Sequence, residues 1–249
     1  MTNLLALGEA ALVENPDGGS PFVLLGDHAG NVIPPSLFDL GVSATDLTRH
    51  IAWDIGVAGV GTALSKRLDA PFVRQRYSRL VIDCNRALDS NGLIVEVSDG
   101  TPVPGNVGLT SAQRQARIAD IHTPYHQSIA ALLAARRQRA MRTLLVSVHS
   151  FTPALGDGVK RPWQVGVLHR GDSRYAHNVY DALQPIFGHE VGDNQPYAMD
   201  GIDFTIPLHA DAYGFEYVEI EIRQDLIGDE KGQADMAALL APLLVSAAR

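Results

Sequence analysis

The sequence predicts an α/β fold with a mixed, mostly parallel central sheet and helices on both faces. Two short runs, 21–25 and 144–148, are apolar almost throughout, which is typical of strands buried on both sides. Segments with a helical spacing of apolar residues alternate with the predicted strands, and this alternation favours a parallel sheet. Hydrophobic residues make up 46% of the 249 residues, enough for a large core, and we expect one domain over residues 1–249.

The first half of the chain is predicted to contain strands, one helix and a long loop. The strand 21–25 leads into a polar loop, and a helix is predicted over 43–68, where a serine cap precedes a first-turn aspartate. Residues rich in β-forming side chains follow at 72–73 and again at 80–82. Glycine and proline recur throughout 84–110, which predicts a loop of a length that is usually functional in a compact domain.

The second half of the chain continues the alternation. A long helical stretch is predicted over 111–142, and Pro124 is expected to interrupt it. The strand 144–148 then leads directly into His149. The remaining predicted elements are a loop over 156–162, a strand over 164–168, a helix over 173–187, a strand over 215–222 and a helix over 233–248.

The charge balance argues against nucleic-acid and membrane partners. Lys and Arg total 20 against 28 Asp and Glu, a formal net charge of −8, so the chain has little to offer a phosphate backbone or an anionic membrane. No apolar stretch reaches the roughly 18 residues of a membrane span. Four arginines fall in the helical pattern and are expected to form a solvated face: Arg136, Arg137, Arg139 and Arg142. The expected partner is a small-molecule substrate, and the oligomeric state stays open.

Cysteine usage and the N-terminus favour a cytoplasmic location. The single cysteine, Cys84, rules out an intrachain disulfide framework and a multi-cysteine zinc site, and it is consistent with a reducing cytosol. Cys84 follows the apolar run 80–82 and is therefore expected to be a buried hydrophobic residue rather than a nucleophile. The residues before the first leucines lack the basic region of a signal peptide.

Several common catalytic motifs are absent. The sequence contains no Gly-x-Gly-x-x-Gly after the first strand, no phosphate-binding Gly-x-x-x-x-Gly-Lys-Ser/Thr loop and no Gly-x-Ser-x-Gly nucleophile elbow. Ser147 and Ser150 flank His149, but nothing marks either hydroxyl as activated. The histidines are therefore the better candidates for chemistry.

His28 and His149 each come after a predicted buried strand. A lone histidine is more often structural, but the carboxyl ends of parallel strands are where ligands bind, and two histidines there point to a shared site. Two imidazoles and a carboxylate are the usual ligands of a hydrolytic zinc site. Asp54, Asp27 and Asp83 are the candidates for the carboxylate, and Asp54 is preferred because it lies among apolar residues, where a charge needs a partner. A salt bridge within a helix is the alternative for Asp54.

Glu219 and Glu221 alternate with apolar residues and so share one face of the predicted strand 215–222. They form either a solvated edge or a pair in which one carboxylate serves as general base. Arg79 and Arg86 bracket the run 80–82. An arginine beside a loop suits bidentate capture of a substrate carboxylate, and a surface ion pair is the alternative.

Five segments in a fixed order carry a family resemblance. They are GDHAGN at 26–31, YSRLVIDCNR at 77–86, PYH at 124–126, SVHSF at 147–151 and EIEIRQ at 219–224. Together they resemble the N-formylglutamate amidohydrolase family over about residues 22–228. The resemblance implies a zinc-exopeptidase-like (phosphorylase/hydrolase-like) fold and a single divalent metal, zinc or another. It also implies hydrolysis of an N-acyl bond on an acidic amino acid.

The resemblance also implies roles for individual residues. His28 and His149 match the family's metal-binding histidines, but Asn31 stands where related carboxypeptidases carry a glutamate ligand, so Asp54 is preferred as the third ligand. The pair Asn85–Arg86 is similar to one that grips a substrate carboxylate. The resemblance places the general base at Glu221 and a group that polarises the scissile carbonyl at Arg79, whereas Glu219 is expected to orient a neighbouring arginine or histidine.

These observations predict a zinc-dependent amidohydrolase that acts on an N-acyl amino acid, with N-formyl-L-glutamate as the first choice. Around His28 the sequence reads Asp-His-Ala-Gly-Asn, where the better-studied members read Pro-His-Ser-Gly, so the acyl group could differ from formyl. The alternatives are a deacylase for another N-acyl amino acid, a small carboxypeptidase, or a non-catalytic protein that binds acyl amino acids.

Overall fold

The computed structural model describes residues 9–155, 158–171, 173–199, 201 and 203–249, and a seven-stranded sheet runs through this part of the chain. In spatial order the strands are β1 (Ala11–Glu14), β3 (Phe72–Gln75), β2 (Phe22–Gly26), β6 (Leu144–Phe151), β9 (Glu216–Arg223), β7 (Val165–Leu168) and β8 (Val191–Asp193). The pairs β3–β2, β2–β6, β6–β9 and β7–β8 are parallel, whereas β1–β3 and β9–β7 are antiparallel. The predicted mixed, mostly parallel sheet is therefore confirmed.

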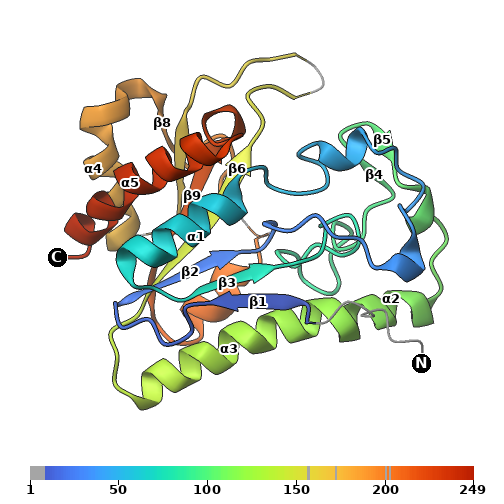
Figure 1. The fold of residues 1–249 in the computed structure, drawn as a ribbon, viewed down its shortest axis with the longest axis horizontal. Coiled ribbons are helices and arrows are strands. Elements are labelled where there is room, and N and C mark those ends of the chain that lie inside the picture. Colours follow the sequence, from blue (N-terminus) through green and yellow to red (C-terminus); the bar gives the residue numbers. More distant parts are fainter. Residues whose placement is uncertain (1–8, 156–157, 172, 200, 202) are drawn as a thin grey trace.

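Helices cover both faces of this sheet (Figure 1). They are α1 (Val57–Leu68), α2 (Ser111–Arg117), α3 (Thr123–Gln138), α4 (Arg174–Phe187) and α5 (Glu230–Ala247). Helices α1 and α5 lie on one side of the sheet and α3 runs along the other, as the α/β prediction requires. None of the helices in the described part of the chain is long and apolar enough to cross a membrane.

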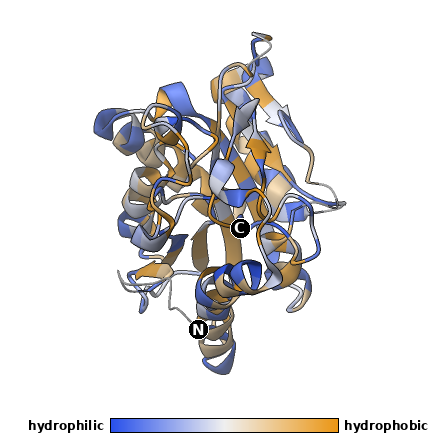
Figure 2. Ribbon diagram, turned by 90° about the vertical axis from the view of Figure 1, so that its right-hand side faces the viewer, coloured by the Kyte–Doolittle hydropathy of each residue, from blue (hydrophilic) through white to orange (hydrophobic). Residues whose placement is uncertain are grey.

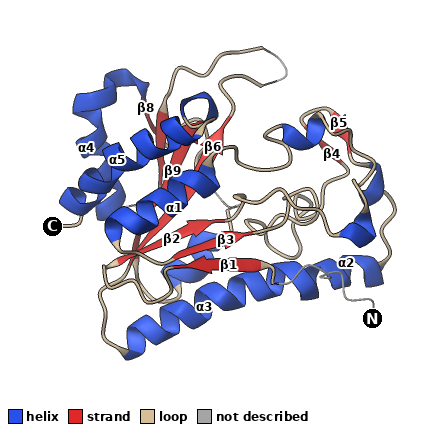
Figure 3. Ribbon diagram, viewed as in Figure 1, coloured by secondary structure: helices blue, strands red, loops and turns tan. Residues whose placement is uncertain are grey.

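Short elements fill the connections, and Figure 3 shows how much irregular chain lies beyond the ends of β2 and β3. A small hairpin pairs β4 (Val97–Ser98) with β5 (Thr101–Pro102). The single-turn helices are η1 (Pro35–Leu37), η2 (Asp46–Thr48), η3 (Pro104–Asn106), η5 (Gly188–Glu190) and η7 (Gln224–Leu226), and π-helical turns form η4 (Ile118–His122) and η6 (Pro207–Asp211).

The strand residues divide into two cores, one on each side of the sheet. Leu24, Val146 and Ile220 pack under α1, α4 and α5, whereas their neighbours Leu25 and Leu145 pack toward α3. The apolar colour of the central strands and the polar outer faces of the helices are visible in Figure 2. On the α3 side, β6 and β9 change from apolar to polar side chains toward their carboxyl ends, and this change creates the site described below.

The helix predicted over 43–68 is wrong in its first half. Only η2 and then α1 are helical there, and Gly56 precedes α1 with a φ of 85°, a left-handed conformation that cannot continue a helix. A side chain at Gly56 would also collide with the carbonyl oxygen of Ile227, at 2.2 Å from the added carbon. The apolar spacing was misleading because Ile51 packs in the α3-side core and Leu64 in the opposite one.

The strand predicted over 80–82 is also wrong. Leu80, Val81 and Ile82 are buried, but they form a turn whose backbone groups bond to side chains instead of a neighbouring strand. The Leu80 carbonyl accepts from Asn106 Nδ2 at 2.9 Å and the Val81 carbonyl from Arg117 Nη1 at 2.8 Å. Burial of an apolar run thus does not imply a sheet when polar side chains satisfy its backbone.

Other predictions need smaller corrections. Residues 111–138 are helical, and Pro124 lies in the first turn of α3, where proline is tolerated, so it does not break the helix. Arg137, Arg139 and Arg142 are exposed, but Arg136 is buried and donates to the carbonyls of 18, 20 and 142, so it does not belong to the solvated face. Part of the predicted loop 156–162 (156–157) lies outside the described residues, and β1 and β8 had no prediction.

Candidate metal centre

Three predicted metal ligands, His28, Asp54 and His149, come together in the structure. His28 lies two residues after β2, and His149 lies within β6, which is longer than the predicted strand 144–148. Asp54 lies before α1, and its backbone N–H donates to the His28 carbonyl at 2.9 Å. One ligand atom from each of the three buried side chains lies within 4.8 Å of the other two.

The donor atoms fit a divalent metal. Asp54 Oδ2 lies 3.0 Å from His149 Nδ1 and 3.6 Å from His28 Nδ1. His28 Nδ1 is buried and has no hydrogen-bond partner among the described residues, which is costly for an imidazole nitrogen unless a further group binds it. Two imidazole nitrogens and one carboxylate oxygen are a ligand set typical of zinc.

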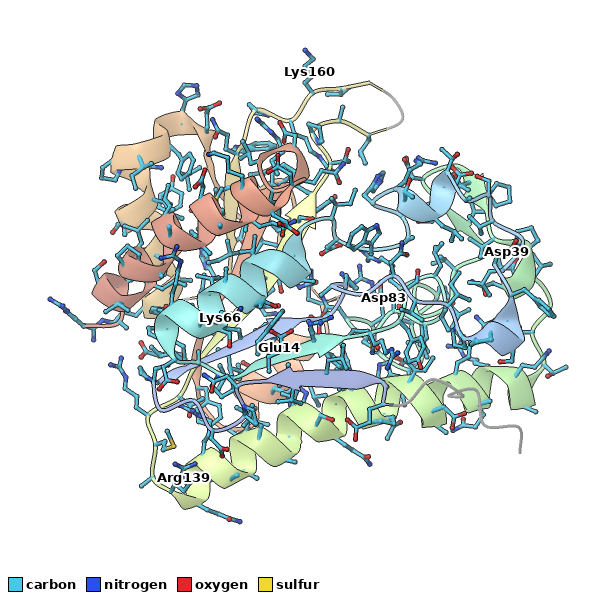
Figure 4. The ribbon with its side chains drawn as sticks, in the orientation of Figure 1. Glu14, Asp39, Lys66, Asp83, Arg139 and Lys160 are labelled. Carbon is cyan, nitrogen blue, oxygen red and sulfur yellow. The ribbon has the colours of Figure 1, made fainter. Side chains whose placement is uncertain are left out.

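Asp83 contacts His28 through the ring nitrogen Nε2, whereas Asp54 lies nearest to Nδ1. Its Oδ1 lies 2.7 Å from His28 Nε2, and its Oδ2 accepts from Arg79 at 2.7 and 3.1 Å. Figure 4 shows Asp83 in the interior, in contrast to Asp39 and Lys160 at the periphery. Burial opposes ionisation of Asp83, but Arg79 and His28 outweigh it and hold its pKa well below the usual value. A carboxylate on the far nitrogen fixes the ring of a metal-binding histidine.

Ser147 and Asp27 lie at the Nε2 atom of His149, and only Ser147 is within hydrogen-bond distance there. His149 Nε2 lies 3.4 Å from Asp27 Oδ2 and 3.0 Å from Ser147 Oγ. Asp27 Oδ1 accepts from the hydroxyls of Tyr125 and Thr205, each at 2.8 Å. Burial would raise the pKa of Asp27, but His149 lowers it to about 2, so the group is ionised. Asp27 and Asp83, both candidates for the third ligand, therefore lie behind the histidines.

Asn31, another candidate for the third ligand, is not part of this group. Its Nδ2 donates to the Leu47 carbonyl at 2.6 Å, an interaction that ties down the loop after β2. Asp54 is thus the carboxylate that the structure places with the two histidines.

Glu219 and Glu221 lie beside His149 in the middle of the sheet. Parallel pairing of β6 with β9 sets His149 opposite Glu221 and Ser147 opposite Glu219. Both glutamates are buried, so the solvated-edge alternative is wrong. Burial raises the pKa of each carboxyl to about 8, although His149 opposes the shift. Glu219 Oε2 lies 3.8 Å from His149 Nε2, and Glu221 Oε2 has no hydrogen-bond partner in the described part of the chain.

A cleft of about 250 Å³ is lined by His28, Asp54, His149, Glu219 and Glu221. Its walls also include His50, Arg79, Asn85, Arg86, Ser150, Phe151, Thr152, Leu168, Tyr197, Ala198 and Asp203. Arg79 reaches Asp54 Oδ1 at 3.6 Å in addition to its bonds with Asp83, so its guanidinium links two of the acids beneath the cleft. The strong ion pairing raises the pKa of Arg79 against the effect of burial, and the group stays charged.

Asn85 and Arg86 are both in the cleft wall, but their side chains differ in their contacts. Asn85 Oδ1 accepts from the backbone N–H groups of Phe204 and Thr205, each at 2.9 Å, and its Nδ2 donates to Asp203 Oδ1 at 3.1 Å. Asn85 therefore organises the segment 203–205. Arg86 Nη1 donates to the Asn85 carbonyl at 2.7 Å and lies 3.8 Å from Asp203 Oδ1.

A group of buried histidines behind this segment was missed by the sequence analysis. His122 Nε2 lies 2.9 Å from the Arg86 carbonyl, and His126 Nε2 lies 2.9 Å from the Cys84 carbonyl. His126 Nδ1 contacts His209 Nε2 at 3.1 Å. The i, i+4 spacing of the first two histidines was the available signal, since it places them on one helix face.

Cys84 is buried, as predicted. Its thiol accepts a hydrogen bond from Gln75 Nε2 at 3.0 Å. Burial raises the pKa of the thiol well above its usual value, which makes it a poor nucleophile.

Comparison with known proteins finds one matching family and similar solved structures. Residues 20–228 match the model of the N-formylglutamate amidohydrolase family. The gene product Atu2144 from Agrobacterium tumefaciens is 37% identical and has a TM-score of 0.93, with 97% of this chain and 95% of that chain covered. An N-formylglutamate amidohydrolase from Ralstonia eutropha JMP134 shares the fold at 20% identity and a TM-score of 0.75, with 96% and 97% covered. No match was found among curated proteins.

Proposed function

The chain belongs to the N-formylglutamate amidohydrolase family, and we propose that it hydrolyses the amide bond of an N-acyl amino acid with the aid of a divalent metal. N-formyl-L-glutamate is the first substrate to test. The observation that carries the proposal is the cleft itself, which joins the buried His28–Asp54–His149 group to Glu221 and Arg86. A buried carboxyl beside a metal-ligand set is the arrangement that general-base hydrolysis requires.

The metal would be held by His28, Asp54 and His149, with zinc as the first choice because of its preference for imidazole and carboxylate. Such an ion supplies a Lewis acid for the amide carbonyl and makes water more acidic. Asp83 holds the His28 ring through Nε2, and Ser147 contacts His149 Nε2 with Asp27 close by, so the Nδ1 atoms of both rings would be left for the ion.

Glu221 serves as the general base. Glu221 lines the cleft, and its buried Oε2 has no hydrogen-bond partner within the described residues, so this carboxyl can accept a proton from the attacking water. The same carboxyl then returns the proton to the leaving amine. Glu219, at 3.8 Å from His149 Nε2, orients that ring and stays outside the proton transfer.

Arg86 binds the carboxylate of the substrate. A planar guanidinium pairs with a carboxylate through two parallel hydrogen bonds, and this pairing would fix the scissile bond over the metal ligands. Asn85 supports Arg86 indirectly, because its side chain is bonded to the 203–205 segment. Arg79 holds Asp54 and Asp83, and its predicted contact with the scissile carbonyl remains a prediction.

The direct test is a substrate screen on purified protein with its metal content measured. Formyl, acetyl and succinyl groups on Glu, Asp and Gln cover the proposed class. We expect hydrolysis of at least one compound, about one metal ion per chain, and loss of both after chelation. A metal-free protein that binds these compounds without cleaving them would instead support the binding alternative, and release of C-terminal residues from peptides would support a carboxypeptidase.

A further inference from the structure

Tyr197 lines the cleft together with Glu221 and has no role in the mechanism above. It lies in the segment that follows β8, and the sheet beside this segment carries two glycines in one row with the proposed base. Gly166 of β7 is paired with Gly192 of β8 on one side and with Glu221 of β9 on the other, and Glu221 is paired with His149 of β6. The row therefore runs from β8 across the sheet to a proposed metal ligand.

The chain after β8 turns back over these two glycines. A Cβ atom added at Gly166 would lie 2.1 Å from the carbonyl oxygen of Gln195, and one at Gly192 would lie 2.6 Å from the same oxygen. The atom added at Gly166 would also lie 3.3 Å from Glu221 Cβ. The Gln195 backbone thus occupies the space of two missing side chains, on the same face of the sheet as Glu221. This path brings the following residues to the cleft.

Two sets of contacts hold Tyr197 in place. The N–H of Asn194 donates to the Val167 carbonyl at 2.9 Å, which fixes the segment to β7. Arg161 lies over the Tyr197 ring, with Cζ 4.8 Å from the ring centroid, and its Nη1 donates to the Thr152 carbonyl at 3.1 Å. A guanidinium over an aromatic face is attracted to the ring, so Arg161 orients the phenol.

The charged groups that act on the Tyr197 hydroxyl include those of the proposed site. Partial burial raises the pKa of the phenol, and the carboxyl groups of Glu221 and Asp54 raise it too, whereas Arg161 lowers it. The phenol therefore keeps its proton at neutral pH and can donate a hydrogen bond. Because Tyr197 is 42% exposed at the cleft, a bound substrate can reach it.

The proposed hydrolysis needs a donor at the scissile carbonyl. When water adds to the carbonyl carbon and gives its proton to Glu221, the electron pair of the C=O double bond moves to the carbonyl oxygen, which becomes negative. Arg79 donates from Nε and Nη2 to Asp83, and its Nη1 lies 3.6 Å from Asp54. All three nitrogens of Arg79 thus face acids beneath the cleft, whereas Tyr197 offers a donor on the cleft wall.

We propose that the Tyr197 hydroxyl donates a hydrogen bond to the scissile carbonyl oxygen of the substrate as that oxygen becomes negative, and that Arg161 positions the phenol. This inference rests on the proposed function and adds one catalytic and one positioning residue to it. Because the hydrogen bond strengthens as negative charge develops, it lowers the barrier more than it tightens substrate binding.

The test compares zinc-loaded wild type with Tyr197→Phe on an N-acyl amino acid that wild type hydrolyses. The phenylalanine keeps the ring and loses only the hydroxyl, so kcat should fall by at least about tenfold while KM stays within about threefold. Tyr213→Phe is the matched control, because Arg137 lies over the Tyr213 ring at 5.7 Å but Tyr213 is not among the residues that line the cleft. An unchanged kcat in Tyr197→Phe, or a raised KM with unchanged kcat, overturns the assignment and leaves the proposed function intact.

A double-mutant cycle tests the positioning role of Arg161. Arg161→Met removes the charge over the ring and should lower kcat severalfold, but it should have no further effect in Tyr197→Phe, where the hydroxyl is already gone. Arg161→Lys keeps a cation over the ring and should retain most of the wild-type kcat. Equal losses from Arg161→Met with and without the hydroxyl would show that Arg161 does not act through Tyr197.

Failure of the proposed function has a different result. If no N-acyl amino acid is hydrolysed, calorimetric titration with N-(methylphosphonyl)-L-glutamate still tests the donor, because a tetrahedral phosphorus with a negative oxygen replaces the acyl carbon. Zinc-loaded wild type should bind this compound at least about tenfold more tightly than Tyr197→Phe, which supports a hydrogen bond from the hydroxyl to a negative oxygen. Equal binding by the two proteins, or binding by neither, overturns it.

Discussion

The buried pair His126 and His209 gives a quantitative prediction for the pH dependence of stability. His126 Nε2 faces the Cys84 carbonyl, which only accepts hydrogen bonds, so this nitrogen carries the proton and Nδ1 accepts from His209 Nε2. These contacts make the His126 ring neutral in the folded protein. Burial lowers the pKa of His126 to about 3, helped by the neighbouring histidines, and lowers that of His209 to about 4.

The magnitude follows from proton linkage. A histidine in the unfolded chain has a pKa of about 6.5. On acidification below this value the unfolded state therefore binds protons at a pH at which the two buried rings of the folded state do not. Above pH 6.5 neither ring changes the free energy of unfolding. As the pH falls from 6.5 toward the folded pKa, that free energy decreases. Between pH 7.5 and pH 5 we expect each of the two histidines to cost about 2 kcal/mol of unfolding free energy.

The assay is urea unfolding at both pH values, with a chelator present so that all proteins are compared without metal. In His126→Gln and in His209→Gln one titrating ring is gone, so the loss between pH 7.5 and pH 5 should be smaller than in wild type by about 2 kcal/mol. His189→Gln, at an exposed position, is the control and should keep the wild-type loss. Identical losses in all four proteins would show that the two buried rings titrate normally, and the reasoning from burial would fail.

Three further predictions concern the active site. Asp54→Ala should reduce bound zinc, as measured by atomic emission, whereas Asn31→Ala should retain it; the reverse result would make Asn31 the ligand. Arg86→Lys should raise KM about 10- to 1000-fold for an N-acyl amino acid, at about 1.4 kcal/mol per factor of ten, and have little effect on an N-acyl amine without the carboxylate. Equal effects would refute a carboxylate clamp. Glu221→Gln should retain its metal but lose at least about a hundredfold in kcat, and Glu219→Gln should lose much less; near-wild-type rates in both would exclude a strand glutamate as base.

The parts of the fold that could be predicted are those in which the pattern of apolar residues has a single structural cause. The strand 144–148 is apolar on both faces because helices cover both sides of β6, and that pattern is legible in the sequence. Residues 43–56 follow a different rule, because their apolar side chains fill the α3-side core while their backbone carries Asp54 to the site. The spacing of apolar residues cannot distinguish a helix from an irregular segment whose apolar side chains are buried, so the helix predicted over 43–56 was wrong.

Some residues of the candidate site could likewise be predicted from the sequence, and others could not. His28 and His149 could be picked out because each is a polar residue at or near the end of an apolar run. Glu219 and Glu221 alternate with apolar residues, and the choice of Glu221 came from the family resemblance. The positions of Asp27 and Asp83 behind the rings depend on which imidazole nitrogen faces which carboxylate, and this information is absent from residue spacing. Asp54 was preferred to Asp27 and Asp83 as the third ligand because apolar residues surround it in the sequence. In the structure the Asp54 carboxyl group is buried.

The charges around the two histidines give an independent argument for a cation. Five carboxyl groups are buried in this part of the described chain, namely those of Asp27, Asp54, Asp83, Glu219 and Glu221. Arg79 is ion-paired with two of them, and two imidazoles can add at most two further positive charges. Buried carboxylates destabilise a fold unless positive charge or protons compensate them. Without an ion, burial raises the pKa of Glu219 and Glu221, so these two carboxyl groups are protonated and carry no charge. A divalent cation at His28, Asp54 and His149 would supply the missing charge and favour the ionised form of Glu221, the form that a general base requires.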